Sequence, residues 1–271
     1  MNSSIPENIV ALAAAAHPDD IEFMMAGTLL MLRNAGADIH MWNLSNGHCG
    51  SNILPAEEIS SIRWEEAQNS ARLAGATIHP SITRDIDILY ERELIARVGA
   101  VIRSIKPSIM LVPSPQDYME DHQNASRLLV TGAFTRGIKN YSTDPPVEPI
   151  NNPVAIYHAM PHGLHDSLRK RVRSGQYVDI TPVLAKKRDM LACHRSQKEW
   201  LDETQGIDSY LTLMESFSCD LGIMSGRFQY AEGWRRHAHW GFASETFDPL
   251  TDMLSESCWT DPEYEQLLGT L

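Results

Sequence analysis

The chain has 271 residues, of which 43% are hydrophobic and 21% are charged, and these fractions are ordinary for a soluble globular protein. Its formal net charge of −12 argues against a nucleic-acid partner, because phosphate binding needs a concentrated surface of Lys and Arg. The N-terminal apolar run, residues 9–16, is too short to span a membrane and lacks the flanks of a signal peptide. Its 12 Met and 4 Cys, with no two Cys spaced as a metal knuckle, indicate a reduced, cytoplasmic protein.

Short apolar runs alternate with helical patterns over the first two-thirds of the chain, which predicts βαβ units and a largely parallel sheet. Strands are expected at residues 9–15, 39–44, 77–82 and 109–112. Helices are expected from about residue 21, from about residue 57, over 94–105, and from about residue 122. Gly36 and Gly75 are suited to end the first two helices, and Pro107 stops the third.

Beyond residue 140 the pattern loosens. A proline-rich stretch at 142–153 predicts a loop, and residues 182–200 and 203–214 have helical patterns. The expected fold class is α/β, with a Rossmann-like, doubly wound and mostly parallel sheet. We divide this single domain into a core of about residues 1–160 and a C-terminal extension of about residues 161–271.

Two clusters of metal-binding residue types follow two of the predicted strands. The stretch Ala16-His17-Pro18-Asp19-Asp20 comes directly after the first strand, and Asp117, Tyr118, Asp121 and His122 come after the strand at 109–112. Ligands of an open parallel sheet bind outside the carboxyl ends of its strands, near the switch in strand order. If these two strands are neighbours across that switch, the two clusters converge on one edge of the sheet.

The residue types at this edge favour a zinc site. A catalytic zinc ion usually takes three protein ligands and keeps one position for water, and His17, Asp20 and His122 could supply the three. Asp19 would remain free to act as a general base on that water. Taken alone, a His-Pro-Asp-Asp stretch is more often a helix-capping turn, since Asp is a favoured N-cap residue. Its position after a strand, together with the second cluster, favours the metal site.

Five ordered motifs over about 215 residues resemble the LmbE-like (PIG-L) deacetylases. They are the stretch from Ala16 to Phe23 with Gly27-Thr28-Leu29, Asn46-Gly47-His48-Cys49-Gly50-Ser51 with Arg63 and Glu66-Ala67, Asp117 to His122, His194-Arg195-Ser196-Gln197, and Tyr230-Ala231-Glu232. The resemblance implies a Rossmann-like enzyme that removes acetyl groups from molecules containing N-acetylglucosamine. It also implies that His17, Asp20 and His122 bind the metal, that Asp19 is the base, and that Arg63 and Asn46 bind substrate.

One position departs from the family in a way that concerns the chemistry. The family has a His that polarises the amide carbonyl, where this chain has Met119, and a thioether can offer no proton. Asp121, which would steady that imidazole, is then expected to cap the helix near His122. We expect His239 to replace the lost imidazole, from its own chain or from a neighbouring subunit. The other candidates are His237 and His194, and the histidines of segment 157–165 could also line a pocket.

These observations predict a zinc-dependent hydrolase that removes an acetyl group from a small-molecule N-acetylated sugar or sugar conjugate. The sequence is compatible with a homo-oligomer. No membrane span is expected. The alternative hypothesis is a metal-retaining but catalytically silent sugar-binding homologue, motivated by Met119 and by His48 where the family has Asp. A nucleotide-binding Rossmann domain is disfavoured, because no Gly-x-Gly-x-x-Gly follows the first strand.

Overall fold

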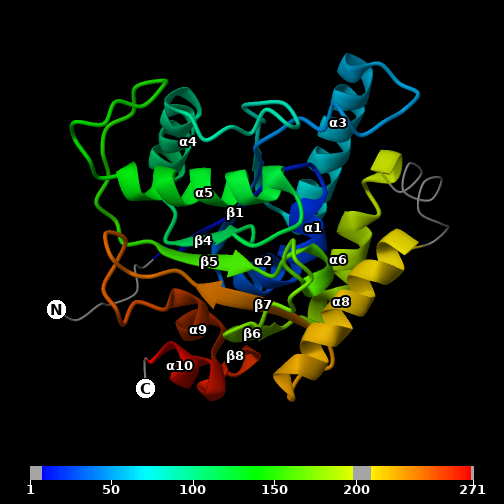
Figure 1. Ribbon diagram of the computed structural model, residues 1–271, viewed down its shortest axis with the longest axis vertical. Helices are drawn as coiled ribbons and strands as arrows, with labels where there is room; N and C mark the ends of the chain where they lie inside the picture. The colour runs from blue at the N-terminus through cyan, green and yellow to red at the C-terminus, as the bar shows by residue number, and fades with distance from the viewer. Residues whose placement is uncertain (1–7, 198–208, 270–271) are drawn as a thin grey trace.

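The computed structural model describes residues 8–197 and 209–269, and in this part of the chain eight strands form one sheet (Figure 1). The strand order is β3-β2-β1-β4-β5-β7-β6-β8. The strands are β1 (Val10–Ala15), β2 (Asp38–Asn43), β3 (Thr77–His79), β4 (Ile109–Val112), β5 (Ala155–Ala159), β6 (Gln176–Asp179), β7 (Ala231–Arg236) and β8 (Cys258–Thr260).

The half of the sheet that runs from β3 to β5 is entirely parallel and has the strand order of a Rossmann fold. The chain leaves β1 toward β2 on one side and returns to β4 on the other, so the switch point lies between β1 and β4, which pair directly. The predicted α/β fold class is therefore confirmed. All four predicted strands occur, and β3 is shorter than expected.

Helices cover both faces of the sheet, with α4 and α5 on one face and α2 and α9 on the other (Figure 1). Side chains of β1 alternate between two cores: Ala11, Ala13 and Ala15 pack on the face of α2, and Leu12 and Ala14 pack on the face of α4 and α5. The α-helices are α1 (Asp20–Met24), α2 (Ala26–Asn34), α3 (Ala56–Ala74), α4 (Arg92–Ile105), α5 (Glu120–Thr135), α6 (Leu184–Leu191), α8 (Ser209–Ser225), α9 (Pro249–Leu254) and α10 (Pro262–Leu268).

Helix boundaries depart from expectation at two places. The helix predicted from residue 21 is two helices, because the backbone leaves helical geometry at Met25, between α1 and α2. The helix predicted over 182–200 ends at Leu191 as α6. Part of that prediction, and the beginning of the helix predicted over 203–214, lie outside the described residues. Gly36 and Gly75 adopt positive φ angles of 98° and 68° just after α2 and α3, as expected of residues that end helices.

The C-terminal part of the chain continues the same sheet with antiparallel strands. Strand β7 runs antiparallel to β5, with Ala159 opposite Trp234 and Tyr157 opposite Arg236. Strand β7 therefore ends beside the amino end of β5, at the edge of the sheet opposite to the carboxyl ends of the parallel strands. This direction decides where the histidines that follow β7 lie.

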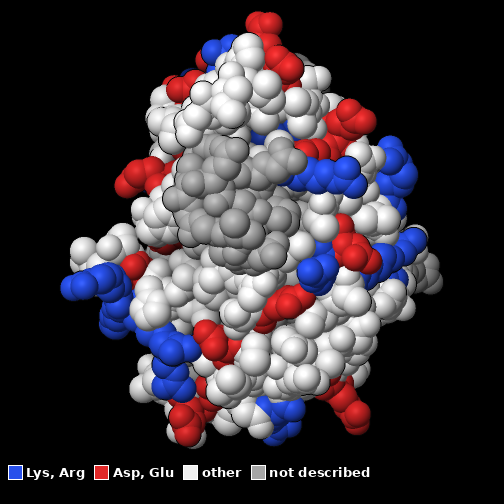
Figure 2. Space-filling model, turned by 90° about the vertical axis from the view of Figure 1, so that its right-hand side faces the viewer, with Lys and Arg blue, Asp and Glu red and all other residues white. Residues whose placement is uncertain are grey.

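The surface carries charges of both signs. On the face shown in Figure 2, basic and acidic side chains are interspersed, and uncharged atoms cover much of the area. Within residues 8–197 and 209–269, no helix is both long and apolar enough to cross a membrane.

Candidate metal centre

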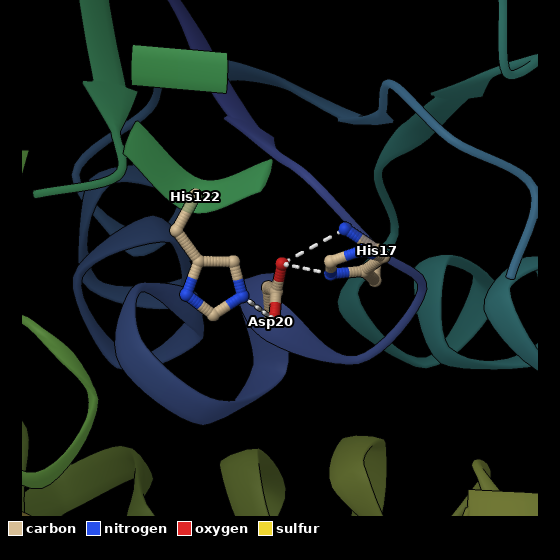
Figure 3. Close-up of side chains that lie close together, drawn as sticks. All are labelled: His17, Asp20 and His122. Carbon is tan, nitrogen blue, oxygen red and sulfur yellow. Dashed lines mark hydrogen bonds and ion pairs between the residues drawn. The ribbon is translucent and has the colours of Figure 1, made fainter. Parts of the chain in front are cut away.

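Three side chains from three elements meet at the carboxyl edge of the sheet, beside the switch point (Figure 3). His17 follows β1, Asp20 begins α1, and His122 lies in the first turn of α5. The Asp20 carboxylate lies between the two imidazoles, with Oδ2 3.4 Å from Nδ1 of His17 and Oδ1 3.4 Å from Nε2 of His122. One ligand atom from each residue lies within 4.8 Å of the other two. The structure thus brings together the three predicted ligands.

A second pair of carboxylates orients the two imidazoles. Oδ2 of Asp121 lies 2.9 Å from Nε2 of His17, and Oδ1 of Asp117 lies 3.0 Å from Nδ1 of His122. Each of these carboxylates contacts the ring nitrogen that faces away from Asp20, so the other nitrogen of each imidazole points toward Asp20. Histidines that bind metals usually have such an outer hydrogen bond, so these residues fit a metal ion. The expectation that Asp121 caps α5 is wrong, because Asp121 binds His17 instead, and Met119 is the N-cap residue.

Charges within the cluster are strongly coupled. Burial opposes protonation of His17, but hydrogen bonds to Asp121 and Asp20 raise the pKa of His17 to about 9. The pKa of His122 is also raised, since the carboxylates of Asp20 and Asp117 outweigh burial. The same contacts hold the pKa of Asp20 well below its usual range, although burial opposes this. The cluster therefore favours positive charge at its centre, as a cation site requires.

Asp19 lies beside this cluster in an unusual backbone conformation. Its φ angle is 112°, in the left-handed region that non-glycine residues rarely adopt and that is often found at active sites. The hydroxyl of Tyr210 donates to its Oδ2 at 2.7 Å, and Nη2 of Arg63 lies 3.5 Å from its Oδ1. Burial raises the pKa of Asp19, and the charge of Arg63 opposes that rise.

Only one of the two predicted substrate-binding residues lines the pocket at this site. Arg63 is buried and lines it, where its guanidinium donates to the carbonyl oxygens of Gly47, at 3.3 Å, and Pro18. Asn46 does not line the pocket. Its Oδ1 accepts the N–H of His48 at 3.3 Å and so supports the turn of the loop.

The pocket has a volume of about 310 Å³ and is lined by both polar and apolar side chains. His17, Asp19, Asp20 and His122 form part of its polar surface. Its apolar wall includes Phe23, Met24, Ile86, Tyr118, Met160 and Leu213. Ligand sites commonly have this character, with apolar walls and a few polar groups that fix the orientation of the ligand.

His239 was expected to replace the imidazole lost at Met119, but within a single chain it lies away from the metal centre. His239 follows β7 and lies beside residues at the amino end of β5, at the opposite edge of the sheet, because β7 is antiparallel. Nδ1 of His237 lies 3.0 Å from Nε2 of His158, a residue of β5. His194 is buried against Glu22, with 3.1 Å between Nε2 and Oε1. A role for His239 would need a neighbouring subunit.

His162, one of the histidines of the predicted pocket segment, does line the pocket. Its backbone N–H donates to Oδ2 of Asp117 at 3.0 Å, and its ring packs against Phe23 and Phe217 at centroid distances of 5.0 and 5.4 Å. Burial and the nearby charge of His122 lower the pKa of His162, so its ring is neutral near neutral pH. The structure therefore retains an imidazole in the pocket that carries the predicted ligands.

Two pocket residues escaped the sequence reasoning. Tyr210 lies in α8, far along the chain from Asp19, and a single Tyr in a helical pattern carries no sign of a partner. Asp85 lies between β3 and α4, and its carboxylate accepts the N–H groups of Gly47 and Cys49 at 2.8 and 2.9 Å. A lone Asp in an irregular segment gives no local signal either, because its partners are 36 and 38 residues away.

The other matched motifs support the walls of the pocket. Glu66 accepts both the backbone N–H and the hydroxyl of Ser196, at 2.8 and 2.6 Å. The side-chain amide of Gln197 donates to the carbonyl of Gly50 at 3.0 Å. The His-x-Ser-Gln motif thus connects α3 to the loop after β2, and its Gln197 also lines the pocket.

The fold and the three-residue cluster define an α/β protein with a candidate metal centre at the carboxyl edge of a Rossmann-like sheet. Residues 12–133 match the family model PIG-L, described as GlcNAc-PI de-N-acetylase. Residues 12–133 are therefore a PIG-L (LmbE-like) family domain, and the resemblance inferred from the motifs is confirmed.

A diacetylchitobiose deacetylase of Thermococcus kodakarensis is 28% identical over 231 residues, covering 83% of this chain and 81% of that protein. The predicted enzyme class, an amidohydrolase, is thereby confirmed at the level of the family.

Two solved structures show how widely this fold is used. The N,N'-diacetylchitobiose deacetylase of Pyrococcus horikoshii superposes with a TM-score of 0.72 at 23% identity, covering 90% of this chain and 89% of that chain. The 4-carboxy-2-hydroxymuconate hydratase of Pseudomonas putida superposes with a TM-score of 0.69 at 23% identity, covering 89% of this chain and 100% of that chain. At these identities the likeness shows the fold, so the reaction must be argued from the site.

Proposed function

We propose that the protein is a zinc-dependent deacetylase that hydrolyses the acetamido group of a small N-acetylated sugar of the N-acetylglucosamine type. The observation that carries this proposal is the cluster of His17, Asp20 and His122, with Asp19 beside it in one pocket. The deacetylase activity of the Thermococcus kodakarensis relative supports the same reaction class. A cytoplasmic location, a homo-oligomer and the division near residue 160 remain predictions from the sequence.

The metal ligands in this proposal are His17, Asp20 and His122, with Asp121 and Asp117 orienting the two imidazoles. Two nitrogens and one carboxylate oxygen are a common ligand set of catalytic zinc. When bound, zinc would supply Lewis-acid activation of the attacking water and of the acetyl oxygen.

Asp19 is the general base in this proposal. Its carboxylate takes the proton of the attacking water as the new carbon–oxygen bond forms, and then returns that proton to the departing sugar amine. The hydroxyl of Tyr210 and the guanidinium of Arg63 hold the Asp19 carboxylate in one orientation. Arg63 also presents a planar donor group at the pocket, which suits hydroxyl groups of the substrate.

His162 is our choice within one chain for the oxyanion donor that Met119 cannot provide. It lines the pocket, and no described residue forms a hydrogen bond with its ring nitrogens. A neutral imidazole carries one N–H donor, and the lowered pKa of His162 favours that form. Donors aimed at a developing oxyanion are among the larger contributions to amide hydrolysis.

The test is acetate release by the purified chain from a panel of N-acetylated sugars and conjugates, with zinc content measured in parallel. We expect zinc-dependent release from at least one N-acetylglucosamine derivative. The variant Asp19→Asn should keep its zinc and lose most turnover, whereas Asp20→Asn should lose zinc affinity. Absence of acetate from every compound, in a zinc-loaded protein, would contradict the proposed function.

A further inference from the structure

A second cluster of ligand-type side chains lies at the pocket, separate from His17, Asp20 and His122. His48 and Cys49 are in the loop after β2, and Asp85 is in the segment before α4. One ligand atom from each of these residues lies within 4.8 Å of the other two. We propose that His48, Cys49 and Asp85 bind a second divalent cation of the zinc class. This inference goes beyond the deacetylase function and does not depend on it.

Distances among the three side chains suit a tetrahedral ion. With Zn–S bonds of about 2.3 Å and Zn–N bonds of about 2.0–2.1 Å, sulfur and nitrogen ligands of one zinc lie about 3.5 Å apart. Sγ of Cys49 is 3.6 Å from Nε2 and 3.8 Å from Nδ1 of His48. Nδ1 of His48 is 3.9 Å from Oδ2 of Asp85. Small side-chain rotations therefore suffice to bring all three to one ion.

Asp85 fixes the loop in the shape that the site needs. Its Oδ1 accepts the N–H of Gly47 and its Oδ2 accepts the N–H of Cys49. A carboxylate oxygen has more than one lone pair, so Oδ2 can accept this hydrogen bond and still bind a cation. The N–H of Asp85 donates to Nδ1 of His48 at 3.3 Å, and this long hydrogen bond is replaced when the imidazole binds the ion. The ligands are thus held together before any ion binds.

The surroundings favour positive charge. The carboxylates of Asp85, Asp121 and Asp87 make the potential at the Cys49 thiol more negative, and the guanidinium of Arg63 opposes them. A negative potential that discourages the thiolate is relieved by a bound cation, which replaces the thiol proton. Sulfur, nitrogen and oxygen ligands in one set are typical of zinc rather than of magnesium or calcium.

The position of the cluster gives an ion access to the same cavity as the predicted catalytic ligands. Cys49 and Asp85 line the pocket, and Cys49 is exposed. An ion held there would therefore adjoin the space that a substrate enters, without sharing a ligand with His17, Asp20 or His122.

Cobalt substitution distinguishes the two sites, because only the second contains sulfur. The full-length protein is dialysed against a chelator and titrated with Co²⁺, and the thiolate-to-cobalt charge-transfer absorption in the near ultraviolet is followed. We expect this absorption in the wild type and in His17→Ala, with one fewer cobalt bound per chain in His17→Ala. We expect its loss in Cys49→Ser and at least a tenfold weaker cobalt affinity in Asp85→Asn.

Cys193→Ser is the matched control, since Cys193 belongs to neither cluster of the described residues, and it should keep the absorption. Circular dichroism verifies that each variant is folded. Absence of the charge-transfer absorption in the folded wild type, or its persistence in Cys49→Ser, would overturn the second site. Either result would leave the deacetylase proposal unaffected, because that proposal is tested by acetate release.

Discussion

At the scale of single residues, the candidate centre assigns different tasks to adjacent carboxylates. Asp20 lies between two imidazoles, and its pKa is held low, whereas Asp19 faces Tyr210 and Arg63, and burial raises its pKa. Asp19 has a positive φ angle of 112°, and its carboxylate contacts Tyr210 and Arg63. One residue of a His-Pro-Asp-Asp turn can thus bind a metal while its neighbour remains available for proton transfer.

The pocket histidine provides the residue-scale prediction. If His162 supplies the oxyanion donor, His162→Ala should keep zinc and folding and lose about 10²–10³ in turnover. His239→Ala is the control, because His239 lies at the other edge of the sheet in the same chain. Kinetics and zinc analysis of both variants are the measurement. If His239→Ala lost the turnover and His162→Ala did not, the donor would come from a neighbouring subunit.

At the scale of elements, the buried carboxylate of Glu232 joins the C-terminal extension to the core. Oε1 of Glu232, in β7, accepts the Lys187 ammonium at 2.7 Å and the N–H of Gly27 at 2.8 Å. Its Oε2 accepts the N–H of Thr28 at 2.7 Å. The carboxylate thereby satisfies backbone donors in the first turn of α2, and its charge suits the positive end of the helix dipole. The Glu of the Tyr-Ala-Glu motif therefore stabilises the packing of β7 against α2 and α6.

Removing that charge should destabilise the whole fold. The Lys187 and Glu232 side chains are both almost fully buried, at 1% and 2% exposure, so Glu232→Gln leaves an uncompensated ammonium group inside the protein. We expect a loss of about 3–5 kcal/mol in the free energy of unfolding, measured by urea denaturation. Glu263→Gln removes an exposed partner of Arg173 and should cost no more than about 1 kcal/mol. Equal stability of the two variants would contradict the structural role of Glu232.

At the scale of the whole molecule, one buried and one partly buried histidine outside the metal centre make the fold sensitive to acid. Burial is the main cause that lowers the pKa of His158 to about 4; its hydrogen bond to the Pro113 carbonyl opposes the shift, and the neighbouring His237 and Arg235 add to it. His79 has a pKa of about 4 as well, because of burial and the adjacent His40. Both rings are neutral in the folded chain and take up a proton more readily when the chain unfolds.

The sign of the pH dependence follows from that difference. Between pH 6.5 and about 4 the unfolded chain binds the proton that folded His158 excludes, so stability falls as the pH falls, by about 3 kcal/mol for this residue. His158→Gln should therefore show a shallower loss of stability from pH 7.5 to 4.5, measured by denaturant unfolding at each pH. His17 has a raised pKa and acts in the opposite direction, but it is common to both proteins and cancels in their difference. Parallel curves would show that His158 is not held neutral.

The sequence by itself determined four of the five parallel strands, β1 to β4, and the three residues that meet at the carboxyl edge of the sheet, but it did not predict β5. Strands β1 and β4 are continuous apolar runs, and His17, Asp20 and His122 lie in the segments that come after them, so local pattern and the geometry of parallel strands were enough. The loop after β2 was also predicted. Asn46 of that loop was predicted to bind substrate, but it does not line the pocket.

Only the tertiary structure decided which residues contact His17 and Asp19, and where the C-terminal histidines lie. Asp121 binds His17 across 104 residues, and Tyr210 binds Asp19 across 191 residues, and neither contact leaves a local pattern in the chain. Strand β7 has no periodicity that reveals its direction, yet its antiparallel pairing carries His239 to the opposite edge. Hydrophobic periodicity records which side of an element is buried, whereas strand direction and contacts over long separations depend on how the whole chain packs.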